Sequence, residues 1–148
     1  MKEEFIPRKG KVYLLSREER REVHKFIKEQ LRKGYIQPSK SLQMAPVFFV
    51  GKKDRKKRMV QDHRYLNEWT VKNNYPLSLI SDIVENIGIK RVFTKMDLWW
   101  GYNNMRIKER DKWKVVFTTP EESFEPTVIF FSLINSPAMF QTMMNEIL

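Results

Sequence analysis

A predicted strand with one acid near its end is the feature that most constrains the fold of this chain. Residues 92–98 alternate in character with a period of two, which predicts a β-strand and places Asp97 on the face opposite its apolar neighbours. Burying such a carboxylate is costly unless it is paired or binds a metal. Gly101 and Tyr102 follow, and they would set a flat aromatic ring beside the acid. From this stretch alone, an Asp that ends the strand and caps the next turn is the simpler interpretation.

Positive charge is concentrated in the first part of the chain. The net charge is +10, and residues 1–64 alone hold an excess of +11, with 19 Lys and Arg against 8 Asp and Glu. Residues 65–104 are balanced at 4 and 4, and residues 105–148 hold 5 and 6. This distribution favours a surface that binds a polyanion. A basic, solvated surface without a partner is the alternative.

Composition excludes several classes of site. The 148 residues include no cysteine, which excludes disulfides and thiolate metal sites. The two histidines, His24 and His63, are too far apart in sequence to form a metal-binding motif. No stretch approaches the roughly 18 apolar residues of a membrane span, and no apolar signal-peptide core follows Met1. We therefore expect an intracellular protein, in the cytoplasm or the nucleus, without membrane contact.

Capping and turn signals organise the first half of the chain. Ser16 and Glu19 have the spacing of a capping box, and the apolar pattern that follows predicts a helix over 17–33, ended by a glycine. Two short β-prone runs, 46–50 and 59–60, then predict a hairpin.

The tip of this hairpin is strongly basic, because six of the seven residues from 52 to 58 are cationic. Such a cluster repels itself unless a partner supplies negative charge. Phosphate is the obvious candidate, since its oxygens accept charge-assisted hydrogen bonds from Lys and Arg. A merely soluble or nuclear-localisation loop is the alternative. The position between two strands makes phosphate binding the better interpretation.

The second half mixes short elements. Apolar spacing predicts a helix over 78–87, and Ser136 with Pro137 predicts the start of another. Further short strands are expected at 105–107, 114–117 and 128–131. Asp62 and Arg64 lie two positions apart, and a structural ion pair is the plain interpretation. The last helix carries an apolar stripe up to the final residue, so we expect the fold to continue in a longer protein.

Eight runs, taken together, resemble the fingers and palm of reverse transcriptases from gypsy-type long-terminal-repeat retrotransposons. The runs are LRKGYIQPS (31–39), APVFFV (45–50), DHRYLN (62–67), VKNNYPL (71–77), FTKMDL (93–98), GY (101–102), RIK (106–108) and NSPAMFQ (135–141). Each run alone is weak. Their shared order and spacing leave little room for coincidence, and the resemblance covers residues from about 20 to 148.

The resemblance implies a role for each matching residue. Asp97 would be the catalytic residue and the first of three carboxylates that hold Mg²⁺ or Mn²⁺, and Tyr102 would crowd the sugar 2′ position and select deoxynucleotides. The residues implied in holding the incoming dNTP are Lys52, Arg58, Arg64, Tyr102 and Phe131. Those implied in contacting an RNA or DNA template-primer are Lys53, Lys56, Lys57, Asn135 and Pro137.

The chain also departs from the family pattern. The usual Val-Asp-Tyr-Arg reads Gln61-Asp62-His63-Arg64 here. The usual Phe-Gly-Leu-Thr-Asn reads Phe131-Ser132-Leu133-Ile134-Asn135, which loses a Gly that lets the backbone approach the substrate. Arg55 replaces a hairpin glycine, and bulky Trp99 and Trp100 follow the catalytic Asp-Leu. The paired aspartates of the family's Tyr-x-Asp-Asp motif would lie beyond the last residue. The pattern resembles a truncated and diverged element copy.

We therefore predict an α+β fold, a partial fingers–palm assembly with a short antiparallel sheet and flanking helices. Fingers are expected at about 1–66 and 105–134, and palm at about 67–104 and 135–148. The predicted function is that of the N-terminal part of an RNA-directed DNA polymerase, inactive as an isolated chain and prone to self-association through exposed palm surface. The alternative is a non-catalytic, basic nucleic-acid-binding or interaction remnant of a decayed element.

Overall fold

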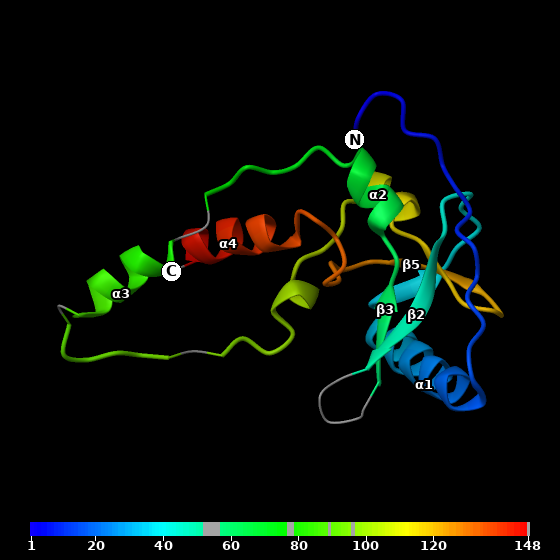
Figure 1. Ribbon diagram of the computed structural model, residues 1–148, viewed down its shortest axis with the longest axis horizontal. Coiled ribbons are helices and arrows are strands. Elements are labelled where there is room, and N and C mark those ends of the chain that lie inside the picture. Colours follow the sequence, from blue (N-terminus) through cyan, green and yellow to red (C-terminus); the bar gives the residue numbers. More distant parts are fainter. Residues whose placement is uncertain (52–56, 77–78, 89, 96, 148) are drawn as a thin grey trace.

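A mixed β-sheet forms the centre of the molecule (Figure 1). The computed structural model describes residues 1–51, 57–76, 79–88, 90–95 and 97–147. The sheet has five strands within these residues, in the order β1-β5-β4-β2-β3, and β2 and β4 run parallel while the other neighbours are antiparallel. The strands are β1 (Ile36–Pro38), β2 (Ala45–Gly51), β3 (Lys57–Gln61), β4 (Phe117–Thr118) and β5 (Ser123–Pro126). The predicted α+β class with flanking helices is confirmed, but the sheet is mixed and not antiparallel throughout, because β2 and β4 run parallel.

Helix α1 (Arg17–Lys33) begins and ends where the capping signals predicted. Ser16 Oγ accepts the backbone N–H of Glu19 at 3.2 Å, and the Glu19 carboxylate accepts the N–H of Ser16 at 2.8 Å. These bonds satisfy two donors for which a helix N-terminus has no carbonyl partner. Gly34 follows with φ of 69°, in the left-handed region, so its N–H reaches the carbonyl oxygens of the last turn.

The main core lies between α1 and the sheet. Phe117 on β4 is completely buried, and the ring of Phe26 on α1 lies 6.3 Å from that of Phe130. The buried side chains of this cluster are Leu15, Val23, Ile36, Ala45, Val47, Phe117 and Phe124. Each Å² of apolar surface removed from water contributes roughly 25 cal/mol, so this cluster is what attaches the helix to the sheet.

The predicted hairpin is confirmed by the pairing of β2 with β3. Its register sets Phe48 opposite Val60 and Phe49 opposite Met59. The basic tip lies mostly outside the described residues, which resume at Lys57. After β3 the chain forms a short helix, α2 (Arg64–Trp69), that was not predicted from the sequence.

The strand predicted over 92–98 was wrong. Its described residues, 92–95 and 97–98, have no regular secondary structure, and their side chains are exposed. A strand satisfies its backbone N–H and C=O groups by pairing with a neighbour. No described strand pairs with this stretch, so its alternating side chains do not lie on the two faces of a sheet.

The other strand predictions were also wrong in part. Residues 105–107 and 128–131 contribute a single isolated bridge, between Arg106 and Val128. Residues 114–117 only overlap the end of a 3₁₀ helix, η2 (Glu109–Lys114), and the start of β4. The sheet instead includes β1 and β5, which are too short to show an alternating pattern.

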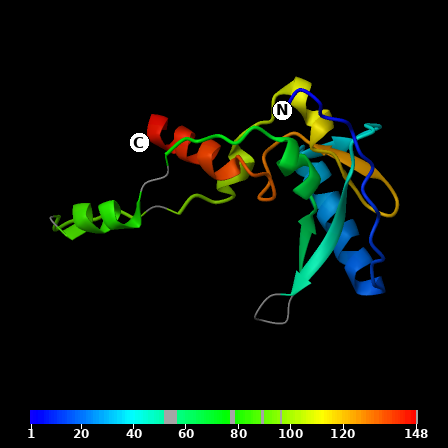
Figure 2. The same ribbon diagram turned by 45° about the horizontal axis from the view of Figure 1, so that its top comes forward.

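Between α2 and a second 3₁₀ helix, η1 (Gly101–Asn104), the chain leaves the sheet. We call this segment, residues 71–100, the excursion. It carries α3 (Ile80–Gly88), which both views show at the end of the molecule farthest from α1 and the sheet (Figures 1 and 2). Helix α4 (Ser136–Ile147) contacts η1. Both predicted helices are confirmed, but none of the described α3 side chains is buried.

Candidate functional site

Three aromatic rings meet where α4 approaches η1. The ring centroid of Tyr102 lies 4.7 Å from that of Phe131 and 5.2 Å from that of Phe140, and both contacts are edge-on. A Cβ on Gly101 would come within 2.9 Å of the Phe140 ring, so glycine permits this close approach. Phe131 is 80% exposed and leaves one side of the cluster open to solvent. The structure therefore brings together two of the predicted nucleotide-binding residues, Tyr102 and Phe131.

Asp97 lies on the exposed stretch that leads into this cluster. The turn between them contains Trp100, which has φ of 56°, an uncommon value for a bulky residue. The Nζ of Lys33, at the end of α1, lies 4.5 Å from the centroid of the Trp100 ring. This cation–π contact joins α1 to the end of the excursion, close to the predicted catalytic residue.

The predicted metal role of Asp97 is chemically consistent but incomplete. Carboxylate oxygens are the ligands that Mg²⁺ prefers, so an exposed Asp fits as one ligand. Among the residues that the structure describes, no group of three or more His, Cys, Asp and Glu side chains could hold a metal ion. Metal binding at Asp97 therefore stays a prediction.

The loop before α4 is tied to α2 by one side chain. Asn67 Nδ2 donates to the carbonyl oxygen of Ser132 at 2.9 Å, and Asn67 Oδ1 accepts the N–H of Ile134, also at 2.9 Å. An amide side chain that both donates and accepts in this way fixes a loop much as a neighbouring strand would. Phe131 belongs to this loop, so its position depends on α2.

Asn135 connects the same loop to the beginning of the excursion. Its Oδ1 accepts the N–H of Asn73 at 3.0 Å, and its Nδ2 donates to the carbonyl oxygen of Val71 at 2.9 Å. Pro137 follows in the first turn of α4 and is exposed. The amide of Asn135 is thus engaged in holding the chain, and its predicted contact with nucleic acid stays a prediction, as does that of Pro137.

Two departures from the family pattern, His63 and Ser132, contact each other. His63 Nε2 lies 3.2 Å from the carbonyl oxygen of Val115, and Nδ1 lies 3.2 Å from Ser132 Oγ. A carbonyl can only accept, so these partners assign the ring proton to Nε2 and make the hydroxyl the donor to Nδ1. Burial lowers the pKa of His63 to about 4, against a smaller opposing effect of the Asp62 charge. The ring is therefore neutral near pH 7.

This contact could not be predicted from the sequence, because the two residues are 69 positions apart. The available signal was indirect. Both residues replace the usual family residue, and a polar pair that enters two buried or half-buried positions together suggests a shared contact. The contact between His63 and Ser132 ties the start of α2 to the loop that carries Phe131.

Arg64 forms an ion pair with Asp62, which is the plain interpretation of their spacing in the sequence. Its Nε and Nη2 donate to the two carboxylate oxygens of Asp62 at 2.8 and 2.7 Å, and the Tyr13 hydroxyl donates to the same carboxylate at 3.3 Å. The hydrogen bond from Arg64 holds the pKa of Asp62 below its usual range. The Arg64 side chain is largely exposed, and its contact with a triphosphate stays a prediction.

The predicted residues of the hairpin are only partly described. Lys52, Lys53 and Lys56 lie outside the described residues. Lys57 Nζ is 2.7 Å from Glu19 Oε1 on α1, and Arg58 is an exposed residue of β3. The structure therefore places Lys57 against α1, while the predicted contacts of these residues with phosphate stay predictions.

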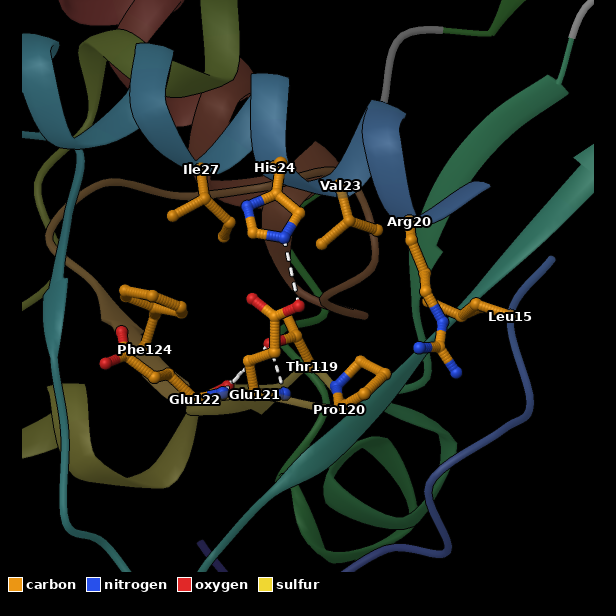
Figure 3. A pocket seen from close by; sticks show the side chains of 10 residues that line it. All are labelled: Leu15, Arg20, Val23, His24, Ile27, Thr119, Pro120, Glu121, Glu122 and Phe124. Atoms are coloured by element: carbon orange, nitrogen blue, oxygen red, sulfur yellow. Dashed lines mark hydrogen bonds and ion pairs between the residues drawn. The ribbon is translucent and has the colours of Figure 1, made fainter. Parts of the chain in front are cut away.

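A separate hollow lies between α1 and the turn from β4 to β5 (Figure 3). His24 Nε2 and Glu121 Oε1 face each other across it at 2.9 Å, and the apolar lining includes Val23 and Phe124. None of the predicted site residues that the structure describes lines this hollow.

Comparison with protein families finds a match to residues 50–148 in the family described as reverse transcriptase (RNA-dependent DNA polymerase). The Transposon Tf2-3 polyprotein of Schizosaccharomyces pombe (strain 972 / ATCC 24843) is 38% identical over 122 residues, which are 82% of this chain and 9% of the polyprotein. The Transposon Tf2-7 polyprotein of the same organism matches with the same identity and coverage. The chain thus spans about a tenth of the length of these relatives.

Solved structures share the fold. The foamy viral protease-reverse transcriptase in complex with an RNA/DNA hybrid is similar with a TM-score of 0.82 at 22% identity, over 97% of this chain and 19% of that chain. The same viral protein in complex with dsDNA is similar with a TM-score of 0.75 at 22% identity, over 97% of this chain and 28% of that chain.

Of the described helices, none is both long and apolar enough to cross a membrane.

Proposed function

This chain belongs to the reverse transcriptase (RNA-dependent DNA polymerase) family, and we propose that it is the N-terminal part of an enzyme that copies an RNA or DNA template into DNA. We infer that the enzyme comes from a gypsy-type retrotransposon and that this sequence has diverged from the usual family pattern. The proposed fingers are residues 1–66 and 105–134, and the proposed palm is residues 67–104 and 135–148. The likeness to two retrotransposon polyproteins supports the first inference.

The observation that carries the proposal is the contact of Tyr102 with Phe131 beside the stretch that holds Asp97. In the proposed reaction a primer 3′-hydroxyl attacks the α-phosphorus of a dNTP, a new P–O bond forms, and the bond to pyrophosphate breaks. Tyr102 would press against the sugar and leave no room for a 2′-hydroxyl. Phe131, whose ring is exposed, would line the same nucleotide pocket.

Charged side chains would supply the rest of the pocket. Lys52, Arg58 and Arg64 would hold the triphosphate by charge-assisted hydrogen bonds. Asp97 would hold a divalent cation, Mg²⁺ or Mn²⁺, whose chemistry is to polarise the phosphate and to orient the attacking and leaving oxygens. The template-primer would lie along Lys53, Lys56, Lys57, Asn135 and Pro137.

We further propose that the isolated chain does not polymerise. Mg²⁺ gives up its water shell reluctantly and is usually fixed by carboxylates together with substrate phosphates. A single carboxylate leaves the position of the ion undefined, and a misplacement of about 1 Å can already cost on the order of 10²-fold in rate. The same reasoning favours the second candidate, a non-catalytic nucleic-acid-binding or interaction remnant, for the chain by itself. Self-association through α3 belongs to this candidate, because the apolar side chains of α3 are exposed.

A primer-extension assay tests the proposal. The 148-residue chain should show no templated incorporation with Mg²⁺ or Mn²⁺, whereas a chimera that supplies the downstream palm of a related polymerase should show some. In the chimera, Asp97→Asn should abolish incorporation. The control, Asp82→Asn, changes an exposed acid on α3 and should leave incorporation unchanged. Equal loss in both variants would exclude a specific role for Asp97. Synthesis by the isolated chain that is lost in Asp97→Asn would overturn the inference of inactivity.

A further inference from the structure

Five cations form one continuous stripe along α1. They are Arg17, Arg21, Lys25, Lys28 and Arg32. At about 100° per residue they fall within an arc of about 80° on the helix, and at 1.5 Å per residue they extend over about 22 Å. We propose that this stripe binds the phosphodiester backbone of a nucleic acid strand, at a place separate from the aromatic cluster around Tyr102.

The stripe lies on the solvent side of the helix. All five side chains are exposed. The residues that attach α1 to the core, among them Val23, Phe26 and Gln30, fall on roughly the opposite side of the helical wheel. The five cations are therefore not needed for packing, and their charged groups are free to meet a partner.

No ion pair within the described residues involves these five side chains. Three of the four acids of the helix share the arc that adjoins the stripe, namely Glu18, Glu22 and Glu29. Glu29 is engaged by Lys33, whose Nζ lies 2.6 Å from Glu29 Oε1. The helix surface is thus divided by sign, with the cations on a row of their own.

The other edge of the stripe is bordered by Arg20 and His24, both of which line the hollow of Figure 3. His24 faces Glu121 there at 2.9 Å. Glu121 and Glu122 are the acids that approach this edge, and they come from the turn between β4 and β5. They lie beyond Arg20 and His24 and leave the five-residue row facing solvent.

A nucleic acid strand fits this row better than a membrane does. A helix that binds a bilayer inserts its apolar face, but the apolar face of α1 is used by the core. A row of about 22 Å matches about six phosphate intervals at 3.4 Å per nucleotide. Arg and Lys, regularly spaced, suit a polyanion that repeats its charge in the same way.

The stripe is also separate from the proposed reaction site. Lys33 is the residue of α1 that contacts Trp100 near that site, and on the helical wheel it lies about 80° beyond the nearest cation of the stripe. A nucleic acid strand on the stripe would therefore pass along the outside of α1. This inference does not depend on whether the chain polymerises.

The salt dependence of binding tests the proposal. The probe is a fluorescein-labelled 20-nucleotide oligo-dT, and the five cations of the stripe are all changed to Gln, which has a similar helix propensity. A matched control changes five exposed cations elsewhere, Lys9, Lys11, Lys40, Lys90 and Arg91, to Gln. At low salt the Kd of the stripe variant should rise at least about tenfold, and its slope of log K against log salt should flatten by about 3.5, at about 0.7 per lost contact.

The matched control should change both quantities much less. Equal flattening in the two variants would show that only the net charge matters, which would overturn the proposal. Binding to phosphatidylserine vesicles is measured as well. If the stripe variant loses vesicle binding but keeps its binding to the oligonucleotide, the stripe binds a lipid surface and the proposal is overturned.

Site-specific crosslinking provides a second test in case the stripe variant, with all five cations changed to Gln, folds poorly. The chain has no cysteine, so Lys25→Cys introduces a single site for a benzophenone label, and Ser81→Cys on the exposed face of α3 provides the control. The label at position 25 should crosslink to the oligonucleotide and the label at position 81 should not. Equal crosslinking at both positions, or none at position 25, would overturn the proposal.

Discussion

The part of the molecule built on the sheet and the excursion of residues 71–100 differ in what their apolar side chains do. Val23 on α1 is 5% exposed, whereas Ile80 on α3 is 79% exposed, although both helices carry apolar residues at helical spacing. In α1 the apolar side faces a sheet whose strands come from two separate parts of the chain, 36–61 and 117–126. In α3 it faces solvent. The comparison shows that periodicity predicts a helix, but whether that helix is buried depends on what lies beside it.

The same contrast applies to strands. β2 pairs with both β3 and β4, so its backbone groups are satisfied on two sides. The stretch 92–98 alternates as clearly as a strand should, yet its described residues remain without regular structure. Pairing rather than alternation decides whether a strand forms, because each unpaired backbone group that leaves water costs free energy.

The largest expected difference between the two regions is in the cost of removing an apolar side chain. Phe117→Ala, in the core, should lower the free energy of unfolding by about 3–5 kcal/mol, because it leaves a cavity where the ring was completely buried. Ile80→Ala, on α3, should change it by less than about 0.5 kcal/mol. Urea unfolding followed by circular dichroism measures both. Similar losses would mean that α3 is packed as well as α1, and the comparison would fail.

An intermediate effect is expected from pH, through His63. The folded protein holds this ring neutral down to a pKa of about 4, while the unfolded chain protonates it near its ordinary value of 6.5. Between these values the unfolded state binds more protons, so stability falls as the pH falls from 6.5 to 4 and this contribution changes no further below 4. At 1.36 kcal/mol per pKa unit the loss is on the order of 3 kcal/mol.

His63→Tyr provides the control, since tyrosine is the usual family residue at this position and does not titrate in this range. Urea unfolding at pH 7.0 and pH 4.5 should show a strong pH dependence in the wild type and a weaker one in the variant. An equally steep dependence in both would remove His63 as the cause. This pH dependence should arise outside the excursion, because the ring of His63 contacts Val115 and Ser132.

An effect smaller than that of pH is expected at the contact between the two regions. Lys33→Gln removes the cation from the Trp100 ring and should cost about 0.5–1 kcal/mol, as at other exposed cation–π pairs. Lys33 also pairs with Glu29, so a double-mutant cycle with Trp100→Leu isolates the part that belongs to the ring. A coupling energy of zero would show that the end of the excursion is not attached to α1 through this contact.

Much of the candidate site could be named from the sequence through the family resemblance, but its geometry could not. Tyr102 and Phe131 were identified as nucleotide-binding candidates, and the structure shows that their rings touch. The sequence did not indicate that Asn67 and the His63–Ser132 pair hold the loop of Phe131, because these contacts join distant positions. Lys57 was assigned to nucleic acid, and its observed contact with Glu19 depends on how β3 lies against α1.

The sequence by itself determined the elements that local chemistry can specify. The capping box at Ser16 and the glycine at position 34 bound α1, because caps act within a few residues. Helix α4 begins at Ser136, where the serine and proline predicted it. Only the tertiary structure decided the order of the strands and the fate of the excursion. The pairing of Ile36 with Pro126 and the exposure of α3 depend on which surfaces lie side by side after folding, and short-range pattern carries no information about that.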